Sequence, residues 1–331
     1  MAHSVALVGA TSLVGEAVLD MLLSAEVPFE HLVALDDGVD EAAVASYGER
    51  NLRVQEISAE RIAGAEIVLL AADQPLAPAL CAILSAAQVR VLDLTGCWSA
   101  EYSATGVVDC AVRGPGIYRQ SQSVTNLLRP VLQPLLADYG IEQVHVTALL
   151  AVSEAGQGGV RELAAQTTSL LNARGAGPKR FGSKQLAFNV LPGYAGLQNN
   201  QPLHLEQQSQ AELQGFAGLE QAVVSVRALL APVFFGHGLQ VVLQTARPVT
   251  AEAAQALWAG QAGVELLDEQ EEGWPTAVTE SAGQDDLFVG RVSGVSGSDR
   301  HLNFWIVSDN VRRGVAYDAV QQTLTLIKHL L

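Results

Sequence analysis

The sequence is poor in positive charge, and this scarcity limits the partners that the protein can have. It contains only three lysines (Lys179, Lys184 and Lys328), and its formal net charge is -16 at pH 7. Nucleic acids and anionic membrane surfaces are negatively charged, so they repel a chain of this composition. We therefore expect neither nucleic acid nor membrane as a partner, and an anionic ligand would depend on locally placed arginines.

Cysteine is equally scarce, and long apolar runs are missing. Cys81, Cys97 and Cys110 form no CxxC pair and have no histidine at metal-ligand spacing, which predicts buried thiols rather than disulfides or metal ligands. No apolar run approaches the roughly 20 residues that span a bilayer. The N-terminus shows no basic region ahead of an apolar one, so no signal peptide is expected. These absences predict a cytoplasmic protein without a bound metal.

Apolar residues are abundant, by contrast, and their pattern divides the chain in two. Hydrophobic residues make up 49% of the 331 positions, enough for two cores. The first 125 residues alternate short apolar strands with helical patterns, which is typical of parallel βαβ units. Strands are expected at 5–8, 32–35, 67–70 and 89–93, and helices at 16–23 and 78–87.

From about residue 140 the pattern changes to longer strands separated by fewer helices. Strands are expected at 142–152, 223–229, 239–245, 288–295 and 303–307, and helices at 160–171, 203–216 and 311–331. This spacing favours an α+β domain built on a largely antiparallel sheet. The fold class predicted from the whole chain is therefore α/β with a second, α+β domain.

A glycine-bracketed loop after the first strand is the candidate phosphate-binding element. Gly9 and Gly15 enclose a loop that opens a helix, a geometry that presents backbone N–H groups to a phosphate. Its GxxxxxG spacing differs from GxGxxG, so a plain tight turn between strand and helix is the alternative. The candidate cofactor-binding positions in this loop are Gly9, Thr11, Ser12, Leu13, Val14 and Gly15.

Two carboxylates close the second expected strand. Asp36 lies about 20 residues past the loop, where an acidic residue accepts hydrogen bonds from the adenosine ribose and repels a 2′-phosphate. No arginine follows before Arg50. A bound dinucleotide would thus be NAD rather than NADP. In the alternative interpretation, Asp36 and Asp37 only shape a polar turn.

Several segments together resemble the aspartate-semialdehyde dehydrogenase family. The segment 117–135, which ends in Leu132-Gln-Pro-Leu135, is similar to the active-site segment of that family. Further similar segments lie at 153–166, 188–192, 232–237 and 308–321. Their order and spacing carry the resemblance, which covers nearly the whole chain.

The resemblance implies an oxidoreductase of amino-acid biosynthesis with two domains. It implies a Rossmann-type NAD(P)-binding domain over 1–125 together with the terminal helix 310–331. It also implies a catalytic and dimerisation domain over 126–309, which would form a homodimer through its sheet. Asn310 falls on the family's Asp-Asn motif and is a candidate nicotinamide contact, with a helix N-cap at 309–310 as the alternative.

The residues that carry the family's chemistry are not all present. Alignment on 132–135 places Ser123 where the family has its nucleophilic cysteine, while His237 matches its acid/base histidine. Leu150 and Leu230 fall where the family has a glutamine and an arginine that hold the substrate, and Ser99 falls on its phosphate-binding arginine. In the loop, Ser12 replaces a third glycine. We therefore expect a degenerate site that is inactive in phosphate-dependent semialdehyde chemistry and that has a nucleotide-binding or regulatory role.

Three alternatives remain open at this point. The chain could still be a working NAD(P)-dependent semialdehyde dehydrogenase. A hydrolase or acyltransferase could use a Ser123/His237 dyad, which requires the two side chains within about 3.5 Å. A protein that binds a partner or a small-molecule ligand is the third alternative.

Overall fold

The computed structural model describes residues 5–27, 32–38, 40, 42–73, 75–96, 115–177, 184–193, 204–268 and 273–330. Cys97, Cys110, Ser99 and Lys179 lie outside this range. The chain forms two compact units, Met1–Ser121 with Val315–Leu331, and Gln122–Gly314.

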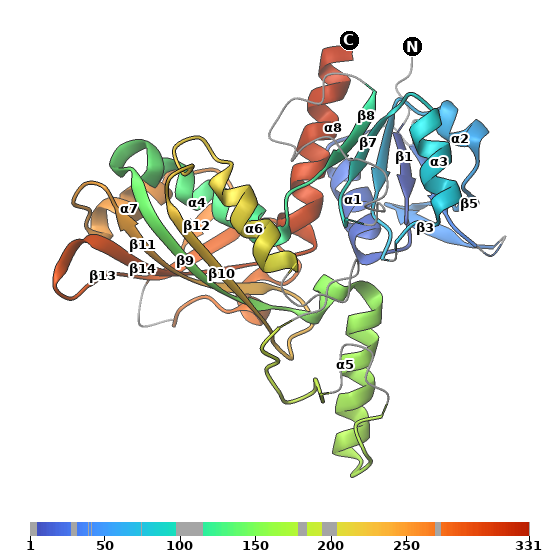
Figure 1. Ribbon diagram of the computed structural model, residues 1–331. Helices are drawn as coiled ribbons and strands as arrows, with labels where there is room; N and C mark the ends of the chain where they lie inside the picture. Colours follow the sequence, from blue (N-terminus) through green and yellow to red (C-terminus); the bar gives the residue numbers. More distant parts are fainter. Residues whose placement is uncertain are drawn as a thin grey trace. The chain divides into compact units, whose positions relative to one another are not determined.

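The first unit is built on a parallel sheet of six strands in the order β5-β2-β1-β6-β7-β8 (Figure 1). The strands are β1 Val5–Val8, β2 Leu32–Asp36, β5 Gln55–Glu56, β6 Ile67–Leu70, β7 Arg90–Asp93 and β8 Gly116–Arg119. Every pairing in this sheet is parallel. The first unit is therefore a Rossmann-type domain, as the sequence predicts.

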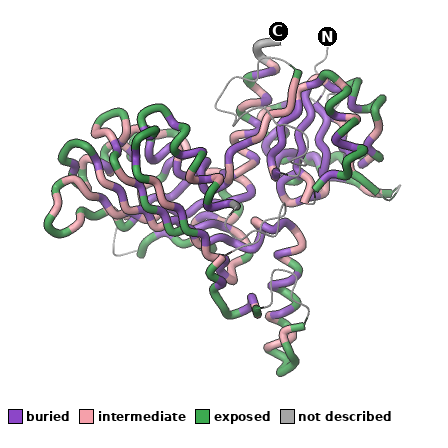
Figure 2. The backbone as a smooth tube through the Cα atoms, in the orientation of Figure 1, coloured by how far each residue is buried: buried purple, intermediate pink, exposed green. Residues whose placement is uncertain are grey.

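Helices accompany this sheet, and a short hairpin lies beside it. The helices are α1 Leu13–Ser24, α2 Ala59–Ala63, α3 Pro78–Ala86 and α8 Tyr317–Leu330, and the hairpin pairs β3 Val44–Tyr47 with β4 Arg50–Arg53. Cys81 of α3 is fully buried. Figure 2 shows that the central strands of this unit are buried throughout.

The second unit carries a mixed sheet in the order β10-β9-β11-β14-β13-β12. Its strands are β9 Ile141–Leu150, β10 Val223–Leu230, β11 His237–Thr245, β12 Val264–Leu266, β13 Leu287–Val295 and β14 Ser298–Ser308. The three central pairings are antiparallel, whereas the outermost strands β10 and β12 pair in parallel. The largely antiparallel α+β sheet expected from the sequence is confirmed.

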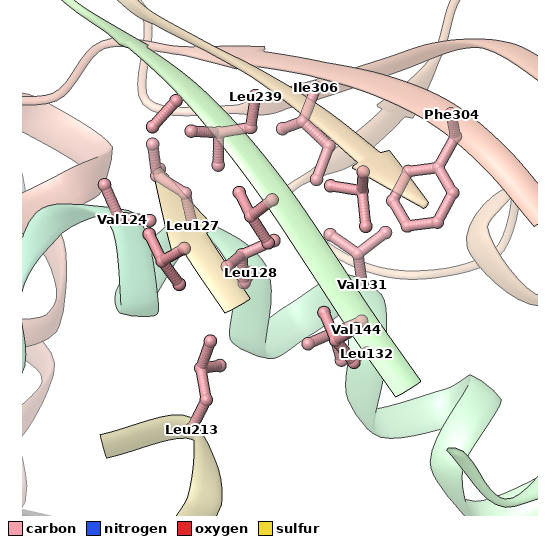
Figure 3. Close-up of a cluster of buried hydrophobic side chains, with 14 of the residues drawn as sticks. Val124, Leu127, Leu128, Val131, Leu132, Val144, Leu213, Leu239, Phe304 and Ile306 are labelled. Carbon is pink, nitrogen blue, oxygen red and sulfur yellow. The ribbon is translucent and has the colours of Figure 1, made fainter. Parts of the chain in front are cut away.

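Helix α4 lies against this sheet and carries Ser123 at its first position. The helices of this unit are α4 Ser123–Tyr139, α5 Gly156–Leu171, α6 His204–Gln214 and α7 Ala251–Trp258. Val124, Leu127 and Val131 of α4 belong to one apolar cluster with Leu239, Phe304 and Ile306 of the sheet (Figure 3). This packing holds the first turn of α4, and with it Ser123, at the edge of the core.

The hydrogen bond that one of the two prolines inside α4 cannot make is replaced by a neighbouring side chain. Pro134 has no N–H to donate to the Pro130 carbonyl four residues earlier. The Gln261 side-chain amide donates to that carbonyl at 2.8 Å instead, so the Pro130 carbonyl keeps a hydrogen-bond donor.

Helix α5 projects away from the sheet of its unit (Figure 1). Its buried residues lie in its first eleven positions, and Leu171 at its end is 75% exposed (Figure 2). Among the helices of the described residues, none combines the length and the hydropathy that crossing a bilayer requires.

Candidate functional site

The glycine loop of the first unit is shaped by close backbone contacts. Gly9 has a φ of 80°, and a Cβ there would meet the Ala72 backbone nitrogen at 2.6 Å. A Cβ on Gly15 would lie 2.1 Å from the Gly9 carbonyl oxygen. Side chains at either position would push the loop apart. The two glycines are therefore required by the packing of β1, the loop and α1.

Ser12 caps α1 and uses one of the N–H groups of the loop. Its hydroxyl accepts a hydrogen bond from the Gly15 N–H at 2.9 Å and donates to the Ala71 carbonyl. The N–H groups of Leu13 and Val14 belong to the first helical turn, where no intrahelical acceptor exists. The amides of Leu13 and Val14 are thus the ones suited to an anionic ligand.

Asp36 lies at the end of β2 beside the loop. Its carboxylate accepts a hydrogen bond from the Thr11 hydroxyl at 3.1 Å and from the Asp37 N–H at 3.0 Å. Burial raises the pKa of Asp36, with repulsion from Asp37 and Glu56 adding to the rise and the two hydrogen bonds opposing it. The carboxylate and the loop face one another, so this pair of predicted site residues is brought together.

Three functional groups meet at the start of α4 in the second unit. The Ser123 hydroxyl donates to the Glu154 carboxylate at 3.1 Å and lies 3.4 Å from Nε2 of His237. The same imidazole nitrogen lies 3.0 Å from Glu154 Oε2. The Ser123 and His237 side chains are buried, and Glu154 is 15% exposed. The structure brings together the two residues expected to form the site and adds a carboxylate between them.

The backbone of Ala151 fixes which nitrogen of His237 carries the proton. The Ala151 N–H donates to Nδ1 of His237 at 3.1 Å, so Nδ1 is an acceptor without a proton. The neutral ring therefore carries its proton on Nε2, which donates to Glu154. The contact thus orients the ring so that Nε2 points at Ser123 and Glu154.

Asn310 lies in the second unit and joins this cluster. Its side-chain oxygen accepts hydrogen bonds from the Ser153 hydroxyl at 2.9 Å and the Gly236 N–H at 3.2 Å. Its amide is left to hydrogen-bond Glu154. The neighbouring Asp309 takes the capping role, because its carboxylate accepts from the N–H groups of Val311 and Arg312.

Glu154 is ionised in this setting. Burial alone would raise the pKa of its carboxyl group, but the hydrogen bond and the electrostatic attraction of His237, with the hydrogen bonds from Ser123 and Asn310, hold that pKa below its usual range. A carboxylate that accepts several hydrogen bonds in its charged form is stabilised in that form. The site therefore contains a fixed negative charge.

Leu150 and Leu230 stand opposite one another on neighbouring strands. They are register partners in the parallel pairing of β9 with β10, and both lie in the apolar core. Adjacent same-face side chains of this kind pack as a pair. The two expected departures from the family pattern therefore form one apolar contact.

Glu154 is the residue whose role the sequence did not reveal. The sequence shows a carboxylate in the turn at 153–156, where the family carries a glycine, but not which groups it contacts. Within the described ranges, no group of three or more histidine, cysteine or acidic side chains could hold a metal ion.

Two family models match the chain. The model described as "Semialdehyde dehydrogenase, NAD binding domain" matches residues 4–119, and the model described as "Semialdehyde dehydrogenase, dimerisation domain" matches residues 132–313.

Full-length relatives and a solved structure agree with these matches. A protein named "USG-1 protein homolog" from Pseudomonas aeruginosa is 34% identical over 99% of this chain and 98% of its own length. "Aspartate-semialdehyde dehydrogenase 2" from Vibrio cholerae is 31% identical over 98% of both chains. The solved structure of a probable aspartate-semialdehyde dehydrogenase from Pseudomonas aeruginosa superposes with a TM-score of 0.87, at 34% identity and full coverage of both chains.

Proposed function

Because the chain belongs to the semialdehyde dehydrogenase family, we propose that it is a member with altered chemistry that does not carry out phosphate-dependent semialdehyde oxidation or reduction. Its role is to bind a ligand or to regulate. The observation that carries this proposal is the contact of Ser123 with Glu154 at 3.1 Å, because the residue at the nucleophile position is a hydroxyl held by a negative charge.

The chemistry at Ser123 supports a loss of nucleophilic catalysis. The family's reaction uses a thiolate, which forms readily at a helix N-terminus. A serine hydroxyl needs a base to become reactive. Glu154 accepts the hydrogen bond of that hydroxyl, but its lowered pKa makes it a weak base. An alkoxide beside this carboxylate would also repel it, so the local charge opposes ionisation of Ser123.

The apolar contact of Leu150 with Leu230 supports a loss of substrate binding. Removing one partner of a buried, hydrogen-bonded charge pair costs roughly 2–5 kcal/mol of binding free energy. Two leucines in register offer no hydrogen bond to a charged substrate. The third expected departure, Ser99, lies outside the described residues.

A direct assay tests the proposal. Purified protein is incubated with aspartate semialdehyde, phosphate and either NAD or NADP, and reduction of the nucleotide is followed at 340 nm. The aspartate-semialdehyde dehydrogenase 2 of Vibrio cholerae serves as the positive control. We expect no turnover above that of a Ser123→Ala variant. Turnover that depends on Ser123 and approaches the rate of the control would contradict the proposal.

We further propose that the first unit binds NAD in preference to NADP. The Asp36 carboxylate and the loop with the Leu13 and Val14 amides support this, because a ribose hydroxyl can donate to Asp36 while a 2′-phosphate is repelled. Thermal stabilisation by each nucleotide measures the preference. NAD should raise Tm in the wild type, and Asp36→Ser should reduce this effect while leaving Gly9 and Gly15 in place. Stronger stabilisation by NADP would contradict the assignment.

A Ser123/His237 hydrolase or acyltransferase is the second candidate. The 3.4 Å distance meets the requirement for such a dyad. In a serine triad, however, the carboxylate binds Nδ1 and leaves Nε2 free to accept the serine proton. Here Ala151 donates to Nδ1 and the protonated Nε2 faces both Ser123 and Glu154. His237 in this form cannot act as the base.

Labelling with a fluorophosphonate probe separates this candidate from the main proposal. We expect no covalent adduct on Ser123 after exposure that fully labels a serine hydrolase. An adduct that disappears in both Ser123→Ala and His237→Ala would favour the hydrolase instead.

A further inference from the structure

Three donors from separate segments converge on the carboxylate of Glu154. The Ser123 hydroxyl comes from the first turn of α4, the His237 Nε2–H from the start of β11, and the Asn310 amide from the segment after β14. The first two lie 3.1 and 3.0 Å from Glu154 Oε2, and the Asn310 amide hydrogen-bonds the same carboxylate. We call these three groups the donor cage.

The His237 and Asn310 donors are oriented by contacts that do not involve Glu154, and the position of Ser123 is limited by a close neighbour. The Ala151 N–H holds the ring of His237, and Ser153 and Gly236 hold the oxygen of Asn310. Gly314 lies against Ser123, since a Cβ on this glycine would be 3.2 Å from the Cβ of Ser123. The donor cage is therefore preorganised by its surroundings.

The backbone at Glu154 is also fixed independently of its side chain. Its N–H donates to the Ala151 carbonyl at 3.1 Å, and the N–H groups of Val152 and Ser153 donate to the carbonyls of Val233 and Phe234. The turn that carries Glu154 is thus anchored by main-chain hydrogen bonds. Shortening the Glu154 side chain should therefore remove the carboxylate from the donor cage and leave the three donors and the backbone of the turn in place.

The chemistry of the cage suits a singly charged, two-oxygen ligand. The Ser123 hydroxyl and the Asn310 amide are uncharged donors, and the Nε2–H of His237 is the third. Hydrogen bonds from neutral donors stabilise a carboxylate well. A doubly charged phosphate would need a cation for balance. Glu154 is 15% exposed, so its side chain is not completely sealed from solvent.

We propose that the donor cage is a binding site for small carboxylates, which the chain fills with its own Glu154. This inference goes beyond the proposed function, because it concerns what occupies the cage whatever reaction the protein retains. Removal of the Glu154 side chain should convert an internal contact into an open site for an external carboxylate.

Chemical rescue of Glu154→Ala by acetate tests the proposal. The thermal unfolding of the variant is followed while sodium acetate is titrated against sodium chloride at constant ionic strength. We expect the variant to have a lower Tm than the wild type. Acetate should raise it saturably, by roughly 5–10 °C at a hundredfold excess over Kd. Wild-type Tm should not respond to acetate beyond the chloride control.

Matched variants distinguish the cage from general anion effects. Glu142→Ala removes a carboxylate from a partly exposed ion pair with Arg300 on the same unit and should show no rescue. Glu154→Ala/Asn310→Ala, which lacks one donor, should bind acetate about tenfold or more weakly. Equal responses of Glu154→Ala and wild type, or an undiminished response of the double variant, would overturn the proposal.

A second variant keeps the test decisive if Glu154→Ala does not fold. Glu154→Gly places at this turn the residue that the family carries there, and it should show the same saturable acetate rescue. Failure of acetate to stabilise a folded Glu154→Gly overturns the proposal. Because the titration measures binding and not turnover, it gives the same answer whether or not the dehydrogenase assay detects activity.

Discussion

Ser123 and Glu154 together determine the electrostatic environment of a nucleophile at the start of α4. A group at position 123 lies within hydrogen-bond distance of a carboxylate whose own pKa is lowered by three donors. The N-terminus of α4 favours negative charge, but Glu154 already supplies that charge. The two influences oppose each other, and the nearby full charge outweighs the partial charge of the helix terminus.

The first prediction concerns Ser123→Cys. The carboxylate of Glu154 should hold the pKa of the new thiol above its free value of about 8.5, and the variant should not oxidise or reduce aspartate semialdehyde. The rate of iodoacetamide labelling at position 123 against pH, measured on the peptide by mass spectrometry, reports that pKa. In Ser123→Cys/Glu154→Gly the thiol should label about tenfold faster at pH 7. Fast labelling of the single variant at pH 7, or its turnover of semialdehyde, would show that Glu154 does not have this effect.

The second prediction uses the lowered pKa of Glu154. A carboxyl group with a folded-state pKa below its unfolded value contributes stability above the unfolded pKa. That contribution is lost as pH falls through the folded pKa. Wild type should therefore be more stable than Glu154→Gln at pH 7, by about 1–3 kcal/mol. The difference should shrink as pH falls below the usual glutamate value of about 4.3.

Urea unfolding of both proteins between pH 7 and pH 3.5 measures this difference. A stability gap that stays constant over the whole range would mean that Glu154 does not titrate with a lowered pKa.

Among the secondary-structure elements, the pairing of β9 with β10 fixes the positions of Leu150 and Leu230. Leu150 and Leu230 end their strands in register and are almost fully buried. Main-chain hydrogen bonds of Leu230 with Leu191 further fix this corner. A polar side chain introduced here would have to be satisfied within an apolar surrounding.

The third prediction compares two arginine substitutions on β10. Leu230→Arg buries a charge in the core and should lower the free energy of unfolding by about 3–5 kcal/mol. Val223→Arg lies on the same strand where the native side chain is 56% exposed, and it should change stability by no more than about 0.5 kcal/mol. Chemical denaturation of the two variants makes the comparison. Equal stabilities would show that position 230 can accommodate the family's arginine.

Patterns in the sequence predicted most elements because strands and helices carry their own periodicity. The four strands expected in the first unit and the main strands of the second are present, with ends shifted by a few residues. Helix α1 begins at Leu13 rather than 16 because Ser12 caps it. Helix α8 begins at Tyr317 rather than 311 because a π-helical turn at Arg312–Ala316 precedes it. The pattern missed short elements such as β5, β8 and β12, which are too brief to show a period.

The contacts of the candidate site were less accessible from sequence. Comparison with the family motif identified Ser123 and His237 as site residues, and their proximity was a requirement of the dyad alternative alone. The contacts of Glu154 with Ser123 and His237 depend on the directions of their side chains. The position of the proton on the His237 ring depends on the Ala151 N–H. Such contacts join residues far apart in the chain, and no local pattern encodes them.

At the scale of the whole molecule, the dimerisation-domain match over residues 132–313 suggests self-association. The fourth prediction is a homodimer, with a molar mass of about 70 kDa from two chains of 34.9 kDa. Light scattering coupled to size-exclusion chromatography measures this mass directly. A monomeric mass at micromolar concentration would contradict the prediction. Constant co-purification with a different chain would favour the partner-binding alternative.

The register pairing of Leu150 with Leu230 also bears on how this lineage can change. An arginine at 230 alone would be a buried charge facing leucine, and a glutamine at 150 alone would be a buried amide without a designed partner. Each single substitution toward the family's residues costs stability before the second can compensate. Stepwise substitution toward the family's residues therefore passes through a destabilised intermediate, so a polar pair at these two positions would have to be introduced by both substitutions together.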